Sequence, residues 1–339
     1  MDGGFQSDKY GAGEGNAMKI CRTTMIIAIL FVIGIVVPYA YAQAVSIYDW
    51  NDLNNVRNDP DGDYVLMNDI NESSAGYGTY NSGSGWNPIA DFSGSLDGQY
   101  HVISGLTIKR EYTSLVGLFG YTAGATISKI GLEDVDIVGG AHVGAFVGTG
   151  NSVISESYAT GTVTGGTYVG GFIGSISKYT EDEPYIVNSY SLVDVYASNK
   201  FAGGMAGSIK VGYPYNSIED SYAAGAVDSG SGNEGGLLGG FYDGAGDQVV
   251  LDSYWDVPVT GQSFSAGGGT GLTTAEMQDP ANFSGWDGSI WKFEAGSYPV
   301  LWAGGSAVPE LPPFAAQALA LVFGSVSVWV RAKRKGCKT

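Results

Sequence analysis

Residues 143–174 read VGAFVGTGNSVISESYATGTVTGGTYVGGFIG, and two short signatures within them return on both sides of this stretch. One is an apolar pair framed by glycines, as in Gly170 to Gly174. The other is an Ile, then Ser-Tyr, then a Val, as in Ile154 to Val163. The Ser-Tyr signature recurs every 32 residues, at Tyr158, Tyr190, Tyr222 and Tyr254. A fixed period of this length predicts a repeat protein.

The composition of the chain favours an all-β fold. Its 54 glycines and 22 tyrosines, against 16 lysines and arginines in 339 residues, favour many turns and strands over helices. The Gly-framed pairs close at residues 120, 148, 174, 207 and 239, which are 26 to 33 residues apart. We therefore expect a parallel β-helix, or solenoid, of about six to seven coils whose loops differ in length.

The solenoid is expected to have a cap at each end. Residues 43–90 form the predicted N-terminal cap, in which Asp49 can cap a short helix. Residues 91–269 form the solenoid, and residues 270–303 form the C-terminal cap. Aromatic side chains of the C-terminal cap are expected to plug the open end of the last coil. These are Trp286, Trp291, Phe293 and Trp302.

The N-terminal end of the chain carries an export signal. Residues 1–42 are predicted to be a signal peptide with its true start at Met18, because a basic segment precedes an apolar run and a small-x-small site. Signal peptidase is expected to cut at that site, which contains Ala40 and Ala42. The body of the protein is therefore expected outside the cell.

The C-terminal end, residues 304–339, is predicted to hold a linker, a transmembrane helix and a basic tail. Its apolar run, residues 314–330, is just long enough to span a bilayer, and it follows Pro309 and Glu310. The basic cluster after it contains Arg331, Lys333, Arg334 and Lys335. This order resembles the PEP-CTERM sorting signal, which implies processing by an exosortase-like enzyme, although Leu311 stands where that family has a second proline. A permanent membrane anchor is the alternative.

The body is strongly acidic. Residues 43–308 contain 30 Asp and Glu against 8 Lys and Arg, and the whole chain has a net charge of −18. Such a surface repels nucleic acid and favours cations or neutral polymers. Both cysteines, Cys21 and Cys337, lie outside the body, so no disulfide framework or zinc cluster is expected there. No cofactor is expected, and calcium binding by this acidic body is left as an open alternative.

The repeats resemble the GLUG motif family of bacterial surface proteins. The family pattern is Gly-Gly-Leu-apolar-Gly followed by Ile-x-Asn-Ser-Tyr-Ala, and it is matched closely at Gly235 to Gly239, at Ile186 to Tyr190 and at Ile218 to Ala223. The resemblance covers roughly residues 45–302. It implies a surface β-solenoid and, by itself, no activity.

A polar residue stands two positions before each repeat tyrosine. These residues are Glu156, Asn188, Asp220 and Asp252. Strand alternation would place them on the same face as the tyrosines and the preceding isoleucines. We expect a structural ladder of stacked side chains. The alternative is that Asp220 and Asp252 form a catalytic pair of a β-helical polysaccharide lyase or hydrolase, but the scarcity of basic residues argues against a lyase.

Long loops supply a candidate contact surface for a ligand. Their tyrosines are Tyr179, Tyr185, Tyr213 and Tyr215. Exposed aromatic rings can bind sugars or a protein partner, whereas folding back over the solenoid is the alternative for each of them. His101 and His142 are each followed by Val, so a metalloprotease motif is absent and no metal site is expected. The sequence favours a non-enzymatic surface protein for adhesion, or for association with a matrix polysaccharide or protein.

Overall fold

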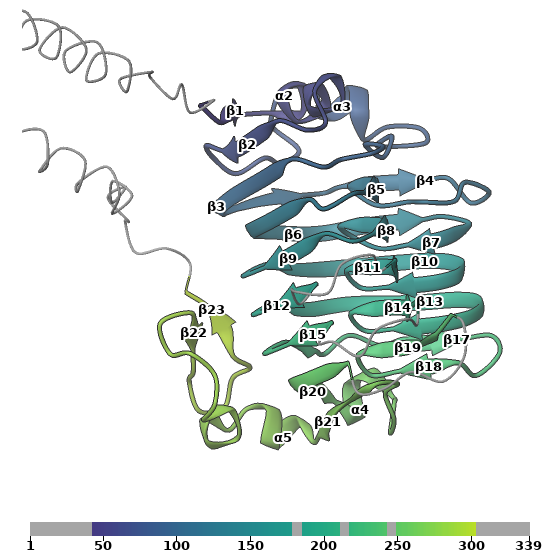
Figure 1. Cartoon of the computed structure of the whole chain (residues 1–339), viewed down its shortest axis with the longest axis vertical. Helices are drawn as coiled ribbons and strands as arrows, with labels where there is room; N and C mark the ends of the chain where they lie inside the picture. Colours follow the sequence, from purple (N-terminus) through teal and green to yellow (C-terminus); the bar gives the residue numbers. More distant parts are fainter. Residues whose placement is uncertain (1–42, 178–184, 211–216, 243–248, 303–339) are drawn as a thin grey trace, which may run out of the picture. The chain divides into compact units, whose positions relative to one another are not determined.

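The computed structural model describes residues 43–177, 185–210, 217–242 and 249–302. This part of the chain is mostly β, and its strands stack in parallel from coil to coil, as the repeat predicts (Figure 1). The predicted signal peptide, transmembrane segment and sorting tail lie outside the described residues. Within the described ranges no helix is long and apolar enough to cross a membrane.

The larger of the two solenoid sheets contains sixteen strands in the described residues, and their pairings are parallel. The strands are β1 (Val45–Ile47), β2 (Asp63–Leu66), β3 (Ser95–Ser104), β4 (Thr107–Lys109), β6 (Thr126–Val138), β7 (Ala141–Val143), β9 (Val153–Ser155), β10 (Tyr158–Gly170), β12 (Ile186–Val187), β13 (Tyr190–Gly203), β15 (Ile218–Glu219), β16 (Tyr222–Ala223), β17 (Val227–Ser229), β18 (Glu234–Gly235), β20 (Val250–Asp256) and β21 (Gly268–Leu272).

The second solenoid sheet is built from the Gly-framed pairs. Each of its strands begins at the second apolar residue of a pair, and the pairings are again parallel. In the described residues the strands are β5 (Phe119–Thr122), β8 (Val147–Gly150), β11 (Ile173–Ile176), β14 (Ala206–Ile209) and β19 (Leu238–Phe241). The glycine two residues before the apolar pair is required by close packing. In one coil, a Cβ on Gly170 would lie 2.2 Å from the carbonyl oxygen of Ile173. A Cβ on Gly203 would lie 2.0 Å from the equivalent oxygen.

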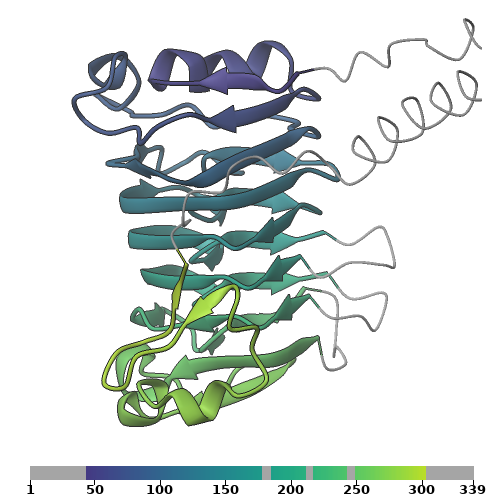
Figure 2. The same cartoon turned by 90° about the vertical axis from the view of Figure 1, so that its left-hand side faces the viewer.

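Residues that are 32 positions apart in the sequence are paired with each other on neighbouring strands of the larger sheet. Tyr158 pairs with Tyr190, Tyr190 with Tyr222, and Tyr222 with Tyr254. The isoleucine or valine four residues before each of these tyrosines is fully buried in the main core. Successive coils therefore place equivalent residues directly above one another (Figure 2).

The serine of each Ser-Tyr signature builds a corner inside the solenoid. Ser157, Ser189, Ser221 and Ser253 are almost completely buried. Oγ of Ser189 accepts a hydrogen bond of 3.2 Å from the backbone N–H of Ser157, and the contact repeats between the later coils at 3.1 Å. Each hydroxyl also donates to the carbonyl oxygen two residues earlier. These bonds satisfy backbone groups at the corner, where strand pairing stops.

The predicted placement of the polar ladder is wrong. Glu156, Asn188, Asp220 and Asp252 all have left-handed backbones, with φ between 40° and 48°. A left-handed residue interrupts the alternation of a strand and turns the chain. The isoleucine before it therefore stays in the core, while the tyrosine after it lies on the outer face, in a separate apolar cluster.

The short helix that the sequence predicts in the N-terminal cap is present. The helices of the described residues are α2 (Trp50–Asn55), η1 (Val56–Asn58), α3 (Tyr77–Tyr80), α4 (Val257–Thr260), α5 (Thr274–Met277) and η2 (Pro280–Phe283). The Asp49 side chain caps α2 through the N–H groups of Asn51 and Asp52. Trp50 and Leu53 on this helix are fully buried in the main core. The helix lies at the N-terminal end of the stack of strands (Figure 1).

The C-terminal segment, residues 273–302, does not plug the last coil as predicted. It contains α5, η2 and a hairpin of β22 (Trp291–Lys292) and β23 (Val300–Leu301), which pair only with each other in the described chain. Its Trp286 and Trp291 pack against the outer tyrosines in one cluster. The hairpin consequently runs along the side of the coils, as the yellow-green ribbon of Figure 2 shows.

Candidate binding site beside the tyrosine ladder

The repeat tyrosines form a ladder of stacked rings on the outer face. The rings of Tyr158 and Tyr190 are 5.0 Å apart and those of Tyr190 and Tyr222 are 5.2 Å apart, with 7° between the ring planes in both pairs. This spacing follows from the distance between neighbouring strands, about 4.8 Å. The ring of Tyr254, in the last rung, meets Phe283 edge-on at 5.2 Å.

The C-terminal segment covers most of this ladder. Tyr222 is fully buried beneath it and donates a hydrogen bond of 2.9 Å to the carbonyl oxygen of Pro299. The indole N–H of Trp286 donates to the carbonyl oxygen of Asp252 at 2.8 Å. Tyr158 is only partly buried, so the cover ends near this rung.

The tyrosine ladder stops where the sequence no longer supplies an aromatic ring. Strand register places Gly131 opposite Tyr158, and Val102 opposite Gly131. A Cβ on Gly131 would lie 2.6 Å from Cζ of Tyr158, so the tyrosine ring reaches over the glycine. A glycine and a valine thus replace two tyrosines, which leaves room on the outer face.

The corner residue also has a left-handed backbone conformation in the two coils that precede the tyrosine ladder. Lys129 and Tyr100 occupy the positions equivalent to Glu156 in the two preceding coils, because each stands two residues before the ladder position. Their φ angles are 55° and 62°. The Nζ atom of Lys129 lies 5.7 Å from the centroid of the Tyr100 ring.

The missing rungs create a hollow of about 190 Å³. Its lining residues are Tyr100, Val102, Ile130, Gly131, Glu156, Tyr158, Tyr190 and Leu301. Leu301 belongs to β23, so the C-terminal segment forms one wall. The hollow therefore combines aromatic side chains, an aliphatic floor and a carboxylate, which is the composition expected of a small-ligand site.

Two tyrosine hydroxyls bind carboxylates at this hollow. The Tyr158 hydroxyl donates to Oε1 of Glu133 at 2.6 Å, and the Tyr100 hydroxyl donates to Oε2 of Glu156. Burial, with a smaller effect of these carboxylates, raises the pKa of both tyrosines well above the usual value. Both hydroxyls are consequently neutral donors at physiological pH.

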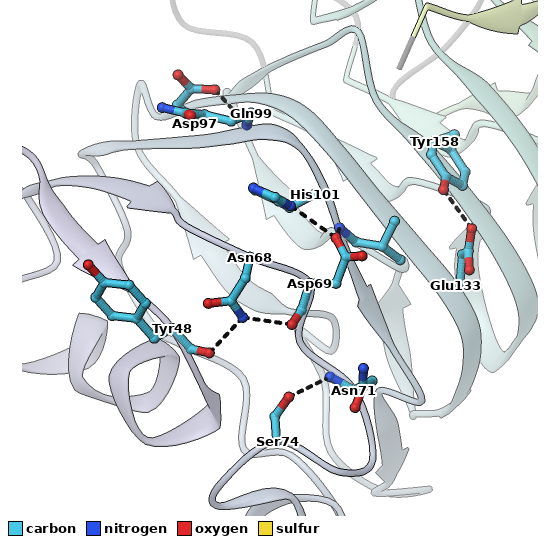
Figure 3. A network of polar contacts seen from close by, with 11 residues as sticks. Tyr48, Asn68, Asp69, Asn71, Ser74, Asp97, Gln99, His101, Glu133 and Tyr158 are labelled. Atoms are coloured by element: carbon cyan, nitrogen blue, oxygen red, sulfur yellow. Dashed lines mark hydrogen bonds and ion pairs between the residues drawn. The ribbon is translucent and has the colours of Figure 1, made fainter. Parts of the chain in front are cut away.

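Further carboxylates lie within electrostatic reach of the tyrosines that line the hollow: Asp69 acts on Tyr158, and Asp97 acts on Tyr100. His101 Nδ1 lies 3.1 Å from Oδ1 of Asp69, and Asp97 accepts from the N–H of Gln99 at 2.9 Å (Figure 3). Figure 3 shows Glu133 beside Tyr158, and it shows His101, on β3, paired with Asp69, in the loop after β2. The surroundings are thus rich in carboxylates, in keeping with the acidic body.

The predicted catalytic pair lies at a different place on the corner. Asp220 is half-buried and Asp252 is exposed. Burial, reinforced by Glu219 and Asp252, raises the pKa of Asp220 to about 6. The two carboxylates interact across neighbouring coils. Neither of them is among the residues that line the hollow.

The loop tyrosines give a mixed result. Tyr185 has 3 % of its surface exposed and packs in the main core, so its side chain is not presented to a ligand. For this residue the folded-back alternative is correct. Tyr179, Tyr213 and Tyr215 lie outside the described residues.

Tyr100, Gly131 and Glu133 were not predicted from the sequence, because they belong to coils without a Ser-Tyr signature. A signal was nevertheless present. Ile127-Ser128 precedes Lys129 as Ile154-Ser155 precedes Glu156, 27 residues later. Extending the ladder through this shorter coil would have located the gap.

Comparison with known proteins supports the fold. A crystal structure described as a “putative immunoglobulin A1 protease” from Bacteroides ovatus superposes with a TM-score of 0.58 over 77 % of this chain and 93 % of that chain, at 20 % identity. At this identity the likeness shows the fold alone. The sequence matches no known family profile, so membership of the GLUG family stays a prediction.

Two relatives match by sequence. Halomucin from Haloquadratum walsbyi is 34 % identical over 276 residues, which is 72 % of this chain and 3 % of halomucin. A “Putative Gly-rich membrane protein” from Evansella cellulosilytica is 37 % identical over 118 residues, which is 33 % of this chain and 13 % of that protein. The chain therefore spans only a small part of either relative.

Proposed function

We propose that this protein is an extracellular, surface-attached β-solenoid that binds a polysaccharide without modifying it. The observation that carries the proposal is the hollow beside Tyr158, where the tyrosine ladder lapses at Gly131. Tyrosine rings offer apolar contact, while their hydroxyls and the neighbouring carboxylates offer hydrogen bonds to sugar hydroxyls. The hollow has a volume of about 190 Å³, which is smaller than the volume of sites for drug-sized ligands, about 300–1,000 Å³. This volume suits one sugar unit.

Location at the surface is supported by the predicted targeting signals at the two ends of the chain. One relative is itself named a membrane protein, which agrees with this proposal. Signal peptidase and an exosortase-like enzyme are the proposed processing partners, and the membrane holds the C-terminal tail. Adhesion or matrix association would follow from repeated weak contacts between surface copies and a polymer.

A glycan and matrix-component array with the purified full chain tests this proposal. Wild type is expected to bind one or more polysaccharides, and a Tyr100→Phe/Glu156→Gln double variant is expected to lose that binding. The array is run with and without calcium. Equal binding by the wild type and the double variant would show that the hollow is not the binding site. If the wild type bound no glycan at all, the proposed function would be wrong.

A hydrolase is the second candidate, and one observation favours it. The raised pKa of Asp220, about 6, is what a general acid near neutral pH requires. Asp252 would then act as its partner. Incubation with neutral and acidic polysaccharides, followed by reducing-end analysis, separates the candidates. Turnover by wild type that Asp220→Asn abolishes would establish the hydrolase.

A further inference from the structure

The charges around the hollow are unequal. Glu156 lines it and Glu133 binds the hydroxyl of its Tyr158 wall. Asp69 and Asp97 lie close enough to act electrostatically on Tyr158 and Tyr100. The nearby cations in the described structure are Lys129, beside the Tyr100 ring, and His101, which is paired with Asp69 when protonated.

This arrangement leaves an excess of negative charge at an aromatic-lined hollow, because four carboxylates stand against Lys129 and, when it is protonated, His101. Each of Glu133 and Glu156 accepts one tyrosine hydroxyl, which is a neutral donor. A carboxylate has about four acceptor positions, so both retain capacity for further donors. A ligand with a positive charge and several hydroxyls would complement this surface.

We infer that the hollow selects a saccharide unit that carries a protonated primary amine, that is, an amino sugar without an N-acetyl group. The inference rests on the proposed polysaccharide-binding function. The ammonium group would lie at Glu156, and the ring hydroxyls would face the hydroxyls of Tyr100 and Tyr158. Leu301 and Val102 would contact the apolar parts of the sugar.

A sugar unit fits these observations better than a lysine side chain of a basic peptide. A lysine has one polar group at the end of a flexible apolar stem, and it needs one carboxylate. The hollow has a tyrosine–carboxylate pair at two of its lining residues, Tyr100 with Glu156 and Tyr158 with Glu133. Several separated donors and acceptors match a polyhydroxylated ring.

Titration of the full chain with two matched probes tests the inference. The probes are an oligomer of β-1,4-linked glucosamine and the fully N-acetylated oligomer of the same length. The pH is about 5.5, well below the pKa of an α-amino group, about 7.7–8.0, so that the amines of the glucosamine oligomer are protonated. Wild type is expected to bind the glucosamine oligomer at least about tenfold more tightly, a difference of about 1.4 kcal/mol.

Two single variants locate the preference. Glu156→Gln keeps the shape of the side chain and removes its charge, and it is expected to abolish the preference between the two oligomers. Asp228→Asn makes the same charge change at an exposed position on β17 and is expected to retain it. Thermal unfolding of each variant confirms that the fold is intact.

The possible outcomes distinguish a failure of amino-sugar selection from a failure of the proposed polysaccharide binding. If wild type binds both oligomers equally, or if Glu156→Gln retains the preference, amino-sugar selection is wrong while polysaccharide binding stands. If wild type binds neither of these oligomers and no glycan on the array, the proposed function fails as well. If an oligolysine peptide binds as tightly as the glucosamine oligomer and Glu156→Gln abolishes both, the ligand is a basic peptide and the inference is overturned.

Discussion

The indole N–H of Trp291 donates a hydrogen bond of 3.2 Å to Oδ1 of Asn188, a residue 103 positions earlier in the chain. The bond joins the C-terminal segment to the left-handed corner of a coil well inside the solenoid. It is accompanied by contact of the Trp291 ring with Tyr190 and Tyr222, at 6.2 and 6.1 Å. The segment consequently stabilises the side of the stack and forms a wall of the proposed binding site.

Removal of Trp291 should destabilise the protein strongly. The side chain is 1 % exposed and its ring lies 4.5 Å from that of Trp286. Trp291→Ala should lower the free energy of unfolding by about 3–5 kcal/mol, because it leaves a cavity in the outer apolar cluster. Denaturant unfolding measures the change. Trp302→Ala, at a side chain that is 47 % exposed, is the control and should cost less than about 1 kcal/mol. Equal effects of the two substitutions would contradict the packing described.

The serine corner makes a second prediction. Ser221→Ala removes the acceptor of the backbone N–H of Ser189, at 3.1 Å, in a buried position. An unsatisfied buried N–H costs about 1–3 kcal/mol, so the free energy of unfolding should fall by about that amount. Ser289→Ala, at an exposed position in the C-terminal segment, should change it by less than about 0.5 kcal/mol. A neutral Ser221→Ala variant would show that the hydroxyl does not support the corner.

Stability should depend on pH through Asp220. Its pKa is about 6 in the folded protein against an ordinary value of 3.8, so ionisation is less favourable in the folded state. The free energy of unfolding should therefore fall as the pH rises from about 4 to about 6, and this contribution should be constant above that range. Because Asp220 is partly exposed to solvent, the effect is expected to be only about 1 kcal/mol.

Asp220→Asn should remove this pH dependence and should be more stable than wild type above pH 7. The matched control is Asp228→Asn, which alters an exposed carboxylate. Unfolding curves at several pH values between about 4 and 8 measure both variants. If Asp220→Asn follows the wild-type pH profile, the carboxylate is not destabilised by its surroundings.

Gly131→Ala should weaken saccharide binding more than it weakens the fold. The new methyl group would lie 2.6 Å from Cζ of Tyr158 and would displace this ring from Glu133. We expect affinity for the bound glycan to fall at least about tenfold. Gly78→Ala, where no atom lies within 4 Å of the added Cβ, is the control and should leave affinity unchanged. Unaltered binding by Gly131→Ala would separate the ligand from the hollow.

The repeat period correctly predicted a mostly β fold with parallel strands, because each coil uses glycines and serines at positions with a specific structural role. The glycines before the apolar pairs allow close backbone contact, and the serines satisfy corner N–H groups. The alternation rule failed at Glu156, Asn188, Asp220 and Asp252 because left-handed residues turn the chain there. Asn and Asp adopt this conformation more readily than most residues, so the polar ladder itself was a signal of the corner.

The course of the C-terminal segment could not be read from the sequence. Its aromatic residues indicated burial, but both the open end of the last coil and the outer tyrosines offered an apolar surface. The contact between Trp291 and Asn188 spans 103 residues and has no periodic signature. The hollow was not predicted for a related reason. It depends on the absence of a side chain at Gly131, and on Tyr100, which belongs to a coil that departs from the repeat.

The decisive experiment for saccharide binding at the hollow is a crystal structure of the full chain soaked with the oligosaccharide that binds most tightly on the array. We expect electron density for one sugar unit between Tyr100 and Tyr158, with a polar atom of the sugar within hydrogen-bond distance of Glu156. A sugar bound elsewhere on the solenoid, with the hollow empty, would contradict this expectation.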